Sequence, residues 1–297
     1  MKEKFIEKNF SKASLLDISR ANRIIAEYQA QGYRLTVRQL YYQMVSRDMI
    51  PNDEKSYKRI VNLISDGRQA GLIDWSMIED RGRVLRVNSH WDRPADILRS
   101  AAYSYAIDKW ADQAWHVEVM VEKDALSGVV GPVCRRLDIA YTANKGYSSS
   151  SAMYEAGKRL ADRHTQGKNI MVIYLGDHDP SGIDMTRDIT ERLMMYADLD
   201  GQIEVERVAL NYDQIEVLRP PENPAKTTDS RAAAYIRLYG HSSWELDAIE
   251  PNELARLIEG QVLAVRDDEL WQRAVAVERA ERSRLEELAD GWSSADE

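Results

Sequence analysis

Residues 169–185 read NIMVIYLGDHDPSGIDM, an apolar run followed at once by an acidic turn that contains glycine. The run over 170–175 is rich in β-branched residues, which is typical of a strand buried on both faces of a parallel sheet. Asp177 and Asp179 follow it, and a spacing of two in extended backbone directs both side chains the same way. Ligands of open α/β sheets bind at the carboxyl ends of the strands, so the two carboxylates predict a Mg²⁺ site. The alternative is that they only cap the next helix.

A third carboxylate ends another predicted strand. Residues 115–123, WHVEVMVEK, alternate in polarity and place Glu122 at the strand end. Between the two strands the sequence predicts a short strand over 138–143, a Gly/Ser loop over 145–150 and a helix over 151–164. This alternation of strands and helices predicts an α/β fold with a mainly parallel, Rossmann-like sheet. We therefore expect Glu122 at the same edge as the two aspartates.

These motifs resemble a Toprim domain, the metal-binding module of topoisomerases, primases and related nucleases. The resemblance rests on Glu122, on the segment Lys145-Gly146-Tyr147, and on residues 176–182, GDHDPSG. The Pro after the second Asp and the Gly two residues later are similar to the A subunit of type IIB topoisomerase VI and its meiotic double-strand-break relative. In that family the Glu and both Asp bind Mg²⁺. The resemblance thus implies that Glu122, Asp177 and Asp179 hold Mg²⁺, or Mn²⁺, and that Lys145 contacts DNA.

One position departs from the family pattern. His178 stands between the two aspartates, where an aliphatic or small residue is usual. The departure removes no ligand, but it leaves the preferred metal open.

Residues 1–92 are expected to form a winged-helix (CAP-like) domain. Helical periodicity predicts helices over 15–31, 37–47 and 54–70, and residues 73–87 are predicted to be a basic hairpin. The polar residues of the third helix would enter a DNA groove, and the hairpin arginines would touch phosphates. These predicted DNA contacts are Lys58, Asn62, Gln69, Arg81 and Arg83. The alternative is a winged helix used only for protein contacts.

The second predicted helix carries an arginine and a tyrosine on one face. Tyr42 lies off the apolar stripe that includes Tyr41, and it follows Arg38 by four residues. An arginine beside a phenol favours the phenolate and offers a fork for a phosphate, as a tyrosine nucleophile requires. The alternative is a tyrosine at a domain contact.

The segment 37–42, VRQLYY, resembles the part of the same family that carries the DNA-cleaving tyrosine. Arg38 and Tyr42 fall on the matching positions, which implies that Tyr42 is the nucleophile. Residues 43–48 lack the acidic, Phe-ending continuation often seen there.

The resemblance covers most of residues 36–265 and implies Mg²⁺-dependent cleavage of double-stranded DNA through a phosphotyrosyl intermediate. In the family the tyrosine of one subunit works with the metal site of another, so a homodimer is implied. Topoisomerase activity would need a separate ATPase subunit, because the chain shows no Walker-type glycine-rich loop. The rival hypotheses are a hydrolytic Toprim nuclease of defence, phage or plasmid origin, and a DNA-binding protein without catalysis.

Composition limits the remaining possibilities. The 297-residue chain has a net charge of −9, and residues 241–297 alone hold 15 acidic and 6 basic residues. The single cysteine, Cys134, excludes an intrachain disulfide. The sequence lacks a membrane-length apolar run and a signal-peptide pattern, so we expect a cytoplasmic, nucleoid-associated protein of a bacterium, archaeon or phage. The expected parts are 1–92, a linking segment over 93–114, the Toprim domain over 115–265, and an acidic helix over 266–297. Within the linking segment we expect a helix over 96–112 with Trp110 on its apolar side.

Overall fold

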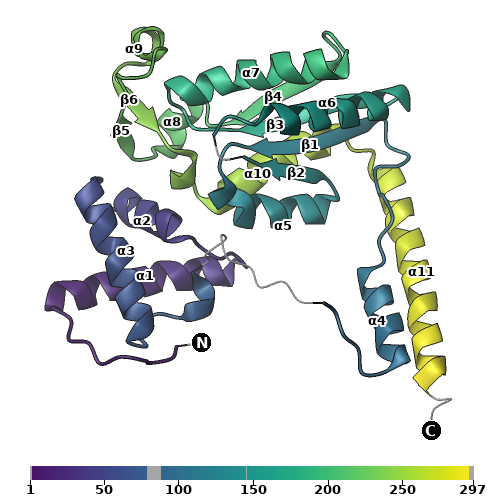
Figure 1. Ribbon diagram of the computed structural model, residues 1–297, viewed down its shortest axis with the longest axis horizontal. Coiled ribbons are helices and arrows are strands. Elements are labelled where there is room, and N and C mark those ends of the chain that lie inside the picture. The colour runs from purple at the N-terminus through teal and green to yellow at the C-terminus, as the bar shows by residue number, and fades with distance from the viewer. Residues whose placement is uncertain (1, 79–87, 145, 294–297) are drawn as a thin grey trace.

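A parallel β-sheet flanked by helices forms the centre of the molecule (Figure 1). The computed structural model describes residues 2–78, 88–144 and 146–293. The sheet has the strand order β2-β1-β3-β4, and each of its pairings is parallel. Its strands are β1 Trp115–Val121, β2 Ala140–Ala143, β3 Asn169–Leu175 and β4 Ile203–Ala209. The predicted α/β fold with a mainly parallel sheet is confirmed.

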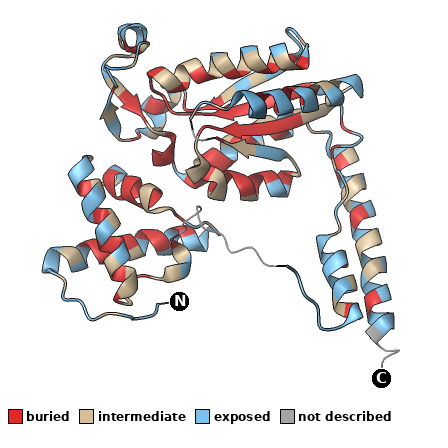
Figure 2. Cartoon of the chain, in the orientation of Figure 1, coloured by how far each residue is buried: buried red, intermediate tan, exposed pale blue. Residues whose placement is uncertain are grey.

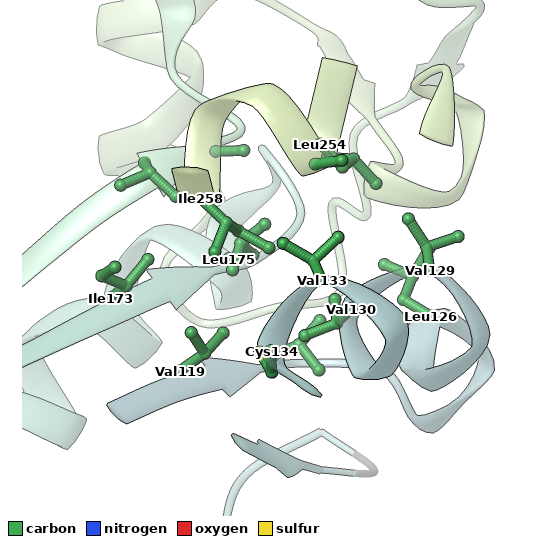
Figure 3. Close-up of a cluster of buried hydrophobic side chains, with 14 of the residues drawn as sticks. Val119, Leu126, Val129, Val130, Val133, Cys134, Ile173, Leu175, Leu254 and Ile258 are labelled. Atoms are coloured by element: carbon green, nitrogen blue, oxygen red, sulfur yellow. The ribbon is translucent and has the colours of Figure 1, made fainter. Parts of the chain in front are cut away.

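Helices cover both faces of this sheet. Helices α6 (Ser150–Thr165) and α7 (Pro180–Ala197) pack on one face, where Leu160 and Leu193 are fully buried. Helices α5 (Ser127–Leu137) and α10 (Pro251–Val265) pack on the other. Figure 3 shows that second core, in which side chains from β1 and β3 meet those of α5 and α10. With helices on both sides, β3 is buried almost throughout, as its unbroken apolar sequence predicts (Figure 2).

Short elements follow β1 and β4 near the carboxyl edge of the sheet. A two-stranded antiparallel ribbon stands beside the sheet there. These elements are η2 Asp124–Leu126, α8 Tyr212–Leu218, β5 Glu222–Pro224, α9 Ala232–Tyr239, β6 Ser242–Trp244 and η3 Leu246–Ala248.

Three N-terminal helices build a separate core. They are α1 Lys12–Ala30, α2 Val37–Ser46 and α3 Glu54–Gln69. Thr36 begins α2 with a capping box, because its side chain accepts from the Gln39 amide while the Gln39 side chain accepts from Thr36. Ala248 of η3 packs into this core, so the N-terminal helices are tied to a segment more than 200 residues away in sequence.

The hairpin expected over 73–87 is seen only in part. Within its described residues, the segment Trp75–Met77 is the short 3₁₀ helix η1, and Ile78 bridges Leu35. The predicted DNA contacts Arg81 and Arg83 lie outside the described residues, as does Lys145.

The linking helix is shorter than expected. Helix α4 covers Pro94–Ser104, and Trp110, predicted on its apolar side, lies beyond it with its indole N–H donating to the Leu137 carbonyl at 2.8 Å. That buried hydrogen bond holds Trp110 against Leu137, the last residue of α5, outside helix α4. Helix α4 packs along the 26-residue helix α11 (Asp268–Ser293), and the pair projects from the sheet region (Figure 1).

Candidate functional site

The predicted acidic residues gather at the carboxyl edge of the sheet. Val121 of β1 pairs with Leu175 of β3, so the residues that follow both strands emerge at one level. The Asp177 amide donates to Glu122 Oε2 at 2.8 Å. A carboxylate from β1 therefore touches the backbone of the turn after β3, and burial raises the pKa of Glu122.

Asp177 points toward a lysine. Its Oδ1 accepts from the Leu246 amide at 2.8 Å, and its Oδ2 lies 2.7 Å from Lys123 Nζ. Burial raises the pKa of Asp177 to about 7, with Lys123 opposing and Glu122 adding to the rise. Negative charge is thus crowded at this edge of the sheet.

Asp179 caps helix α7. Its Oδ1 accepts from the Gly182 amide at 2.6 Å and from the Ser181 hydroxyl at 2.9 Å, and its Oδ2 lies 3.9 Å from Lys226 Nζ. The helix-cap alternative therefore describes the contacts of Asp179 but not those of Asp177. Within the described residues the two aspartates share no hydrogen-bond or ion-pair partner, although the backbone at Asp179 is still extended and helix α7 begins only at Pro180.

The donor chemistry fits Mg²⁺ or Mn²⁺, since buried carboxylates with raised pKa values gain from a divalent cation. The positions of these carboxylates do not by themselves complete a metal site. Among the described residues, no group of three or more His, Cys, Asp or Glu side chains is placed to hold a metal ion.

His178 is part of an aromatic cluster. Its ring lies 2.8 Å from the Tyr235 hydroxyl through Nδ1 and packs against Tyr239 and Trp244. Burial lowers the pKa of His178 to about 4, so the ring is neutral at pH 7. The unusual residue between the aspartates thus packs the fold behind the acidic edge.

Sequence reasoning missed the centre of the site. Lys123 Nζ contacts Asp177, Glu245 and Asp247, the last at 3.3 Å. Both acids lie in the segment WELDAI at 244–249, where an aspartate between apolar residues was the available signal. The lysine directly follows Glu122, just beyond the end of β1, so it emerges at the same edge of the sheet.

Arg38 joins the N-terminal helices to this cluster. Its Nη2 lies 2.6 Å from Glu245 Oε2, and its Nε lies 3.2 Å from Asp247 Oδ2. Burial would raise the pKa of Glu245, yet Lys123 and Arg38 outweigh it and lower that pKa. Glu245 is therefore held ionised between two cations, one from each part of the chain.

Tyr42 lies beside Arg38 as the helical spacing predicts. The guanidinium carbon sits 5.7 Å from the centre of the Tyr42 ring. Tyr42 is only 7% exposed, and the segment η3 after β6 packs against its helix α2. Burial and the charge of Glu245 raise the pKa of Tyr42, against the opposing effects of Arg38 and Lys123. Arg38 thus lowers the pKa of Tyr42, as expected, but burial and Glu245 raise that pKa by more.

A cavity of about 360 Å³ opens beside this pair. Arg38 and Tyr42 line it together with the aromatic rings of Tyr41 and Tyr57, and Asn223 closes the side formed by β5. Asp53 and Glu54 also line it, so the cavity places two carboxylates beside its aromatic, amide and guanidinium groups.

The predicted DNA contacts of α3 are solvent-facing near its start. Lys58 and Asn62 are exposed, with Lys58 Nζ lying 2.7 Å from Glu54 Oε1. The Gln69 carbonyl accepts from the Phe5 and Ile6 amides, so the N-terminal segment lies over the end of that stripe.

Compared with known proteins, the chain matches no family model, and no curated protein matches it significantly. Within the part of the chain that the structure describes, no helix combines the length and the apolar character needed to span a membrane.

Proposed function

We propose that this protein cleaves double-stranded DNA in a metal-dependent reaction in which Tyr42 attacks a backbone phosphate. The observation that supports this most is the chain of ion pairs from Arg38 through Glu245 to Lys123 and Asp177. It ties the arginine beside Tyr42 to the acidic edge of a parallel sheet, where open α/β folds bind their ligands.

Each residue of this network has a role in the proposed reaction. The Tyr42 oxygen forms a bond to phosphorus, and the bond between phosphorus and the leaving deoxyribose oxygen breaks. The phenolic proton passes through solvent to the leaving deoxyribose oxygen, because Lys123 and Arg38 hold Glu245 ionised and make it a weak base. Glu245 instead orients Arg38 through their ion pair. Arg38 balances negative charge on the phosphate, and the cavity beside Tyr42 receives the adjoining nucleotide.

A divalent cation at Glu122 and Asp177 would supply Lewis-acid stabilisation of the phosphate oxygens. Lys58 and Asn62 would contact the duplex as part of a winged helix. We propose in addition that the sheet region is a Toprim domain, that the protein lies at the nucleoid and that a separate ATPase subunit acts with it.

We also propose that two copies act together, one on each strand. In the family that the sequence resembles, tyrosine and metal site come from different subunits. Here Arg38 pairs with Glu245 of its own chain, which favours a complete site in each copy.

The buried state of Tyr42 favours a second candidate, hydrolytic cleavage. A phenol with a raised pKa is a poor nucleophile unless DNA binding changes its surroundings. In that reaction a metal-activated water attacks, and Tyr42 only contacts the DNA.

One assay separates the candidates. Supercoiled plasmid is incubated with the protein and Mg²⁺ or Mn²⁺, the reaction is stopped with detergent, and protein-linked DNA ends are compared with free ends. Transesterification predicts linked ends that disappear in Tyr42→Phe and in Asp177→Asn. Hydrolysis predicts free ends that persist in Tyr42→Phe but not in Asp177→Asn. Binding without cutting under every metal would contradict both.

A further inference from the structure

Lys123 occupies the centre of a carboxylate cluster. Its ammonium lies 2.7 Å from Asp177 and 3.3 Å from Asp247, and it is in contact with Glu245 as well. The lysine side chain is only 19% exposed. Three carboxylates from two distant segments thus surround one compact positive charge.

Asp247 is the least satisfied member of the cluster. Its side chain is fully buried, and within the described residues neither carboxylate oxygen has a hydrogen-bond partner. The charges closest to it are Lys123 and Arg38, at 3.3 and 3.2 Å. A buried carboxylate without hydrogen bonds is costly to maintain, so its oxygens are available to a better ligand.

The three carboxylates offer what a hard divalent cation prefers. Oxygen ligands of this kind bind Mg²⁺, Mn²⁺ or Ca²⁺, and an ammonium is a point charge of one unit only. Asp177, Asp247 and Glu245 all lie within ion-pair distance of the Lys123 ammonium, so the lysine acts as a fixed cation between them.

We propose that Asp177, Glu245 and Asp247, which among the described residues form no metal-holding group with the Lys123 ammonium between them, become a cation-binding cage when that ammonium withdraws. A divalent cation and Lys123 then compete for Asp177, and a cation binds at this edge only when the lysine withdraws. Because Glu245 and Asp247 also hold Arg38, that withdrawal is transmitted to the arginine beside Tyr42. The inference rests on the proposed function only in taking Asp177 as a residue of the cation chemistry.

The test is Mn²⁺ binding to the full chain in the absence of DNA, followed by electron paramagnetic resonance of the free ion. Lys123→Met removes the built-in cation, and we expect it to bind Mn²⁺ at least about tenfold more tightly than the wild type, since one unit charge is removed within contact distance. We also expect Mn²⁺ to raise the melting temperature of this variant more than that of the wild type.

Lys109→Met is the matched control. Lys109 is also largely buried, and it lies 2.5 Å from Glu278 and 3.9 Å from Asp138 in a different part of the fold. Its loss should leave Mn²⁺ affinity unchanged. An equal gain in both variants, or no gain in Lys123→Met, would overturn the inference.

The variant Lys123→Met, Asp247→Asn removes one charge of each sign and covers the case in which Lys123→Met does not fold. It should bind Mn²⁺ more tightly than the wild type, because Asp177 and Glu245 remain without the lysine. Affinity equal to that of the wild type would contradict the cage. Failure of the wild type to cut DNA, with the affinity gain present, would refute the proposed function but not this inference.

Discussion

Arg38 Nη2 lies 2.6 Å from Glu245 Oε2, although 207 positions separate the two residues in sequence. This contact brings helix α2, with Tyr42, to the acidic edge of the sheet. The N-terminal helices and the sheet region therefore share one charged site, and its members can be tested separately.

The first prediction concerns the stability of this junction. Arg38→Ala leaves the fully buried carboxylate of Asp247 with Lys123 as its nearest cation, so we expect the free energy of unfolding to fall by about 2 kcal/mol. Urea denaturation at pH 7 measures it. Arg187→Ala, which removes two ion pairs of an exposed arginine on α7, should have no measurable effect. Equal losses in both variants would show that the junction adds nothing.

The second prediction concerns a glycine that allows the turn after β3. A Cβ at Gly182 would lie 2.2 Å from the Asp177 carbonyl oxygen, a backbone atom that cannot move aside. Gly182→Ala should destabilise the protein by at least about 2 kcal/mol and weaken Mn²⁺ binding. Gly260→Ala in α10 meets no heavy atom within 4 Å and should be neutral or slightly stabilising. Thermal unfolding of both variants decides this, and a stable Gly182→Ala would contradict the geometry.

The third prediction concerns pH. Burial would raise the pKa of Glu118, but Arg159 at 2.7 Å and His116 outweigh it and lower that pKa to about 2, from an ordinary value of 4.5. The ionised form is thus favoured by folding, so the contribution to stability is complete above about pH 5 and is lost as the pH falls from 4.5 toward 2.

Glu118→Gln should accordingly lower the free energy of unfolding by about 2 kcal/mol at pH 7 and by progressively less below pH 4.5. Urea titrations at several pH values measure the difference from the wild type. Glu204→Gln, an exposed change on β4, is the control and should show no such trend. A difference that stays constant with pH would contradict the account.

The fourth prediction concerns which chains form one site. Tyr42→Phe and Asp177→Asn are each expected to abolish cleavage. If every copy uses its own Tyr42 and Asp177, an equal mixture of the two variants should remain inactive in the plasmid assay. Recovery of about a quarter or more of the wild-type activity would show that tyrosine and acidic site come from different subunits.

Much of the fold was predictable from local sequence. The strand-helix order, the burial of β3 and the capping of α2 by Thr36 follow from apolar patterns and turn residues within short windows. Glu122 and Asp177 were expected at one edge because parallel strands end together, and the hydrogen bond between them agrees with that expectation.

The missed features depend on contacts between distant segments. Glu245 and Asp247 reach the site only because η3 packs against α2, and no local pattern encodes that contact. The end of α4 at Ser104 was missed because Trp110 follows a helical spacing but is held by a hydrogen bond to Leu137.

The central claim is that Tyr42 becomes covalently bound to DNA. The protein is incubated with plasmid and Mg²⁺ or Mn²⁺, stopped with detergent, and digested with nuclease and protease for mass spectrometry. The account predicts a peptide that contains Tyr42 and carries a nucleotide phosphate, absent when Asp177 is replaced by Asn. Cut DNA with Tyr42 recovered only in unmodified form would contradict it.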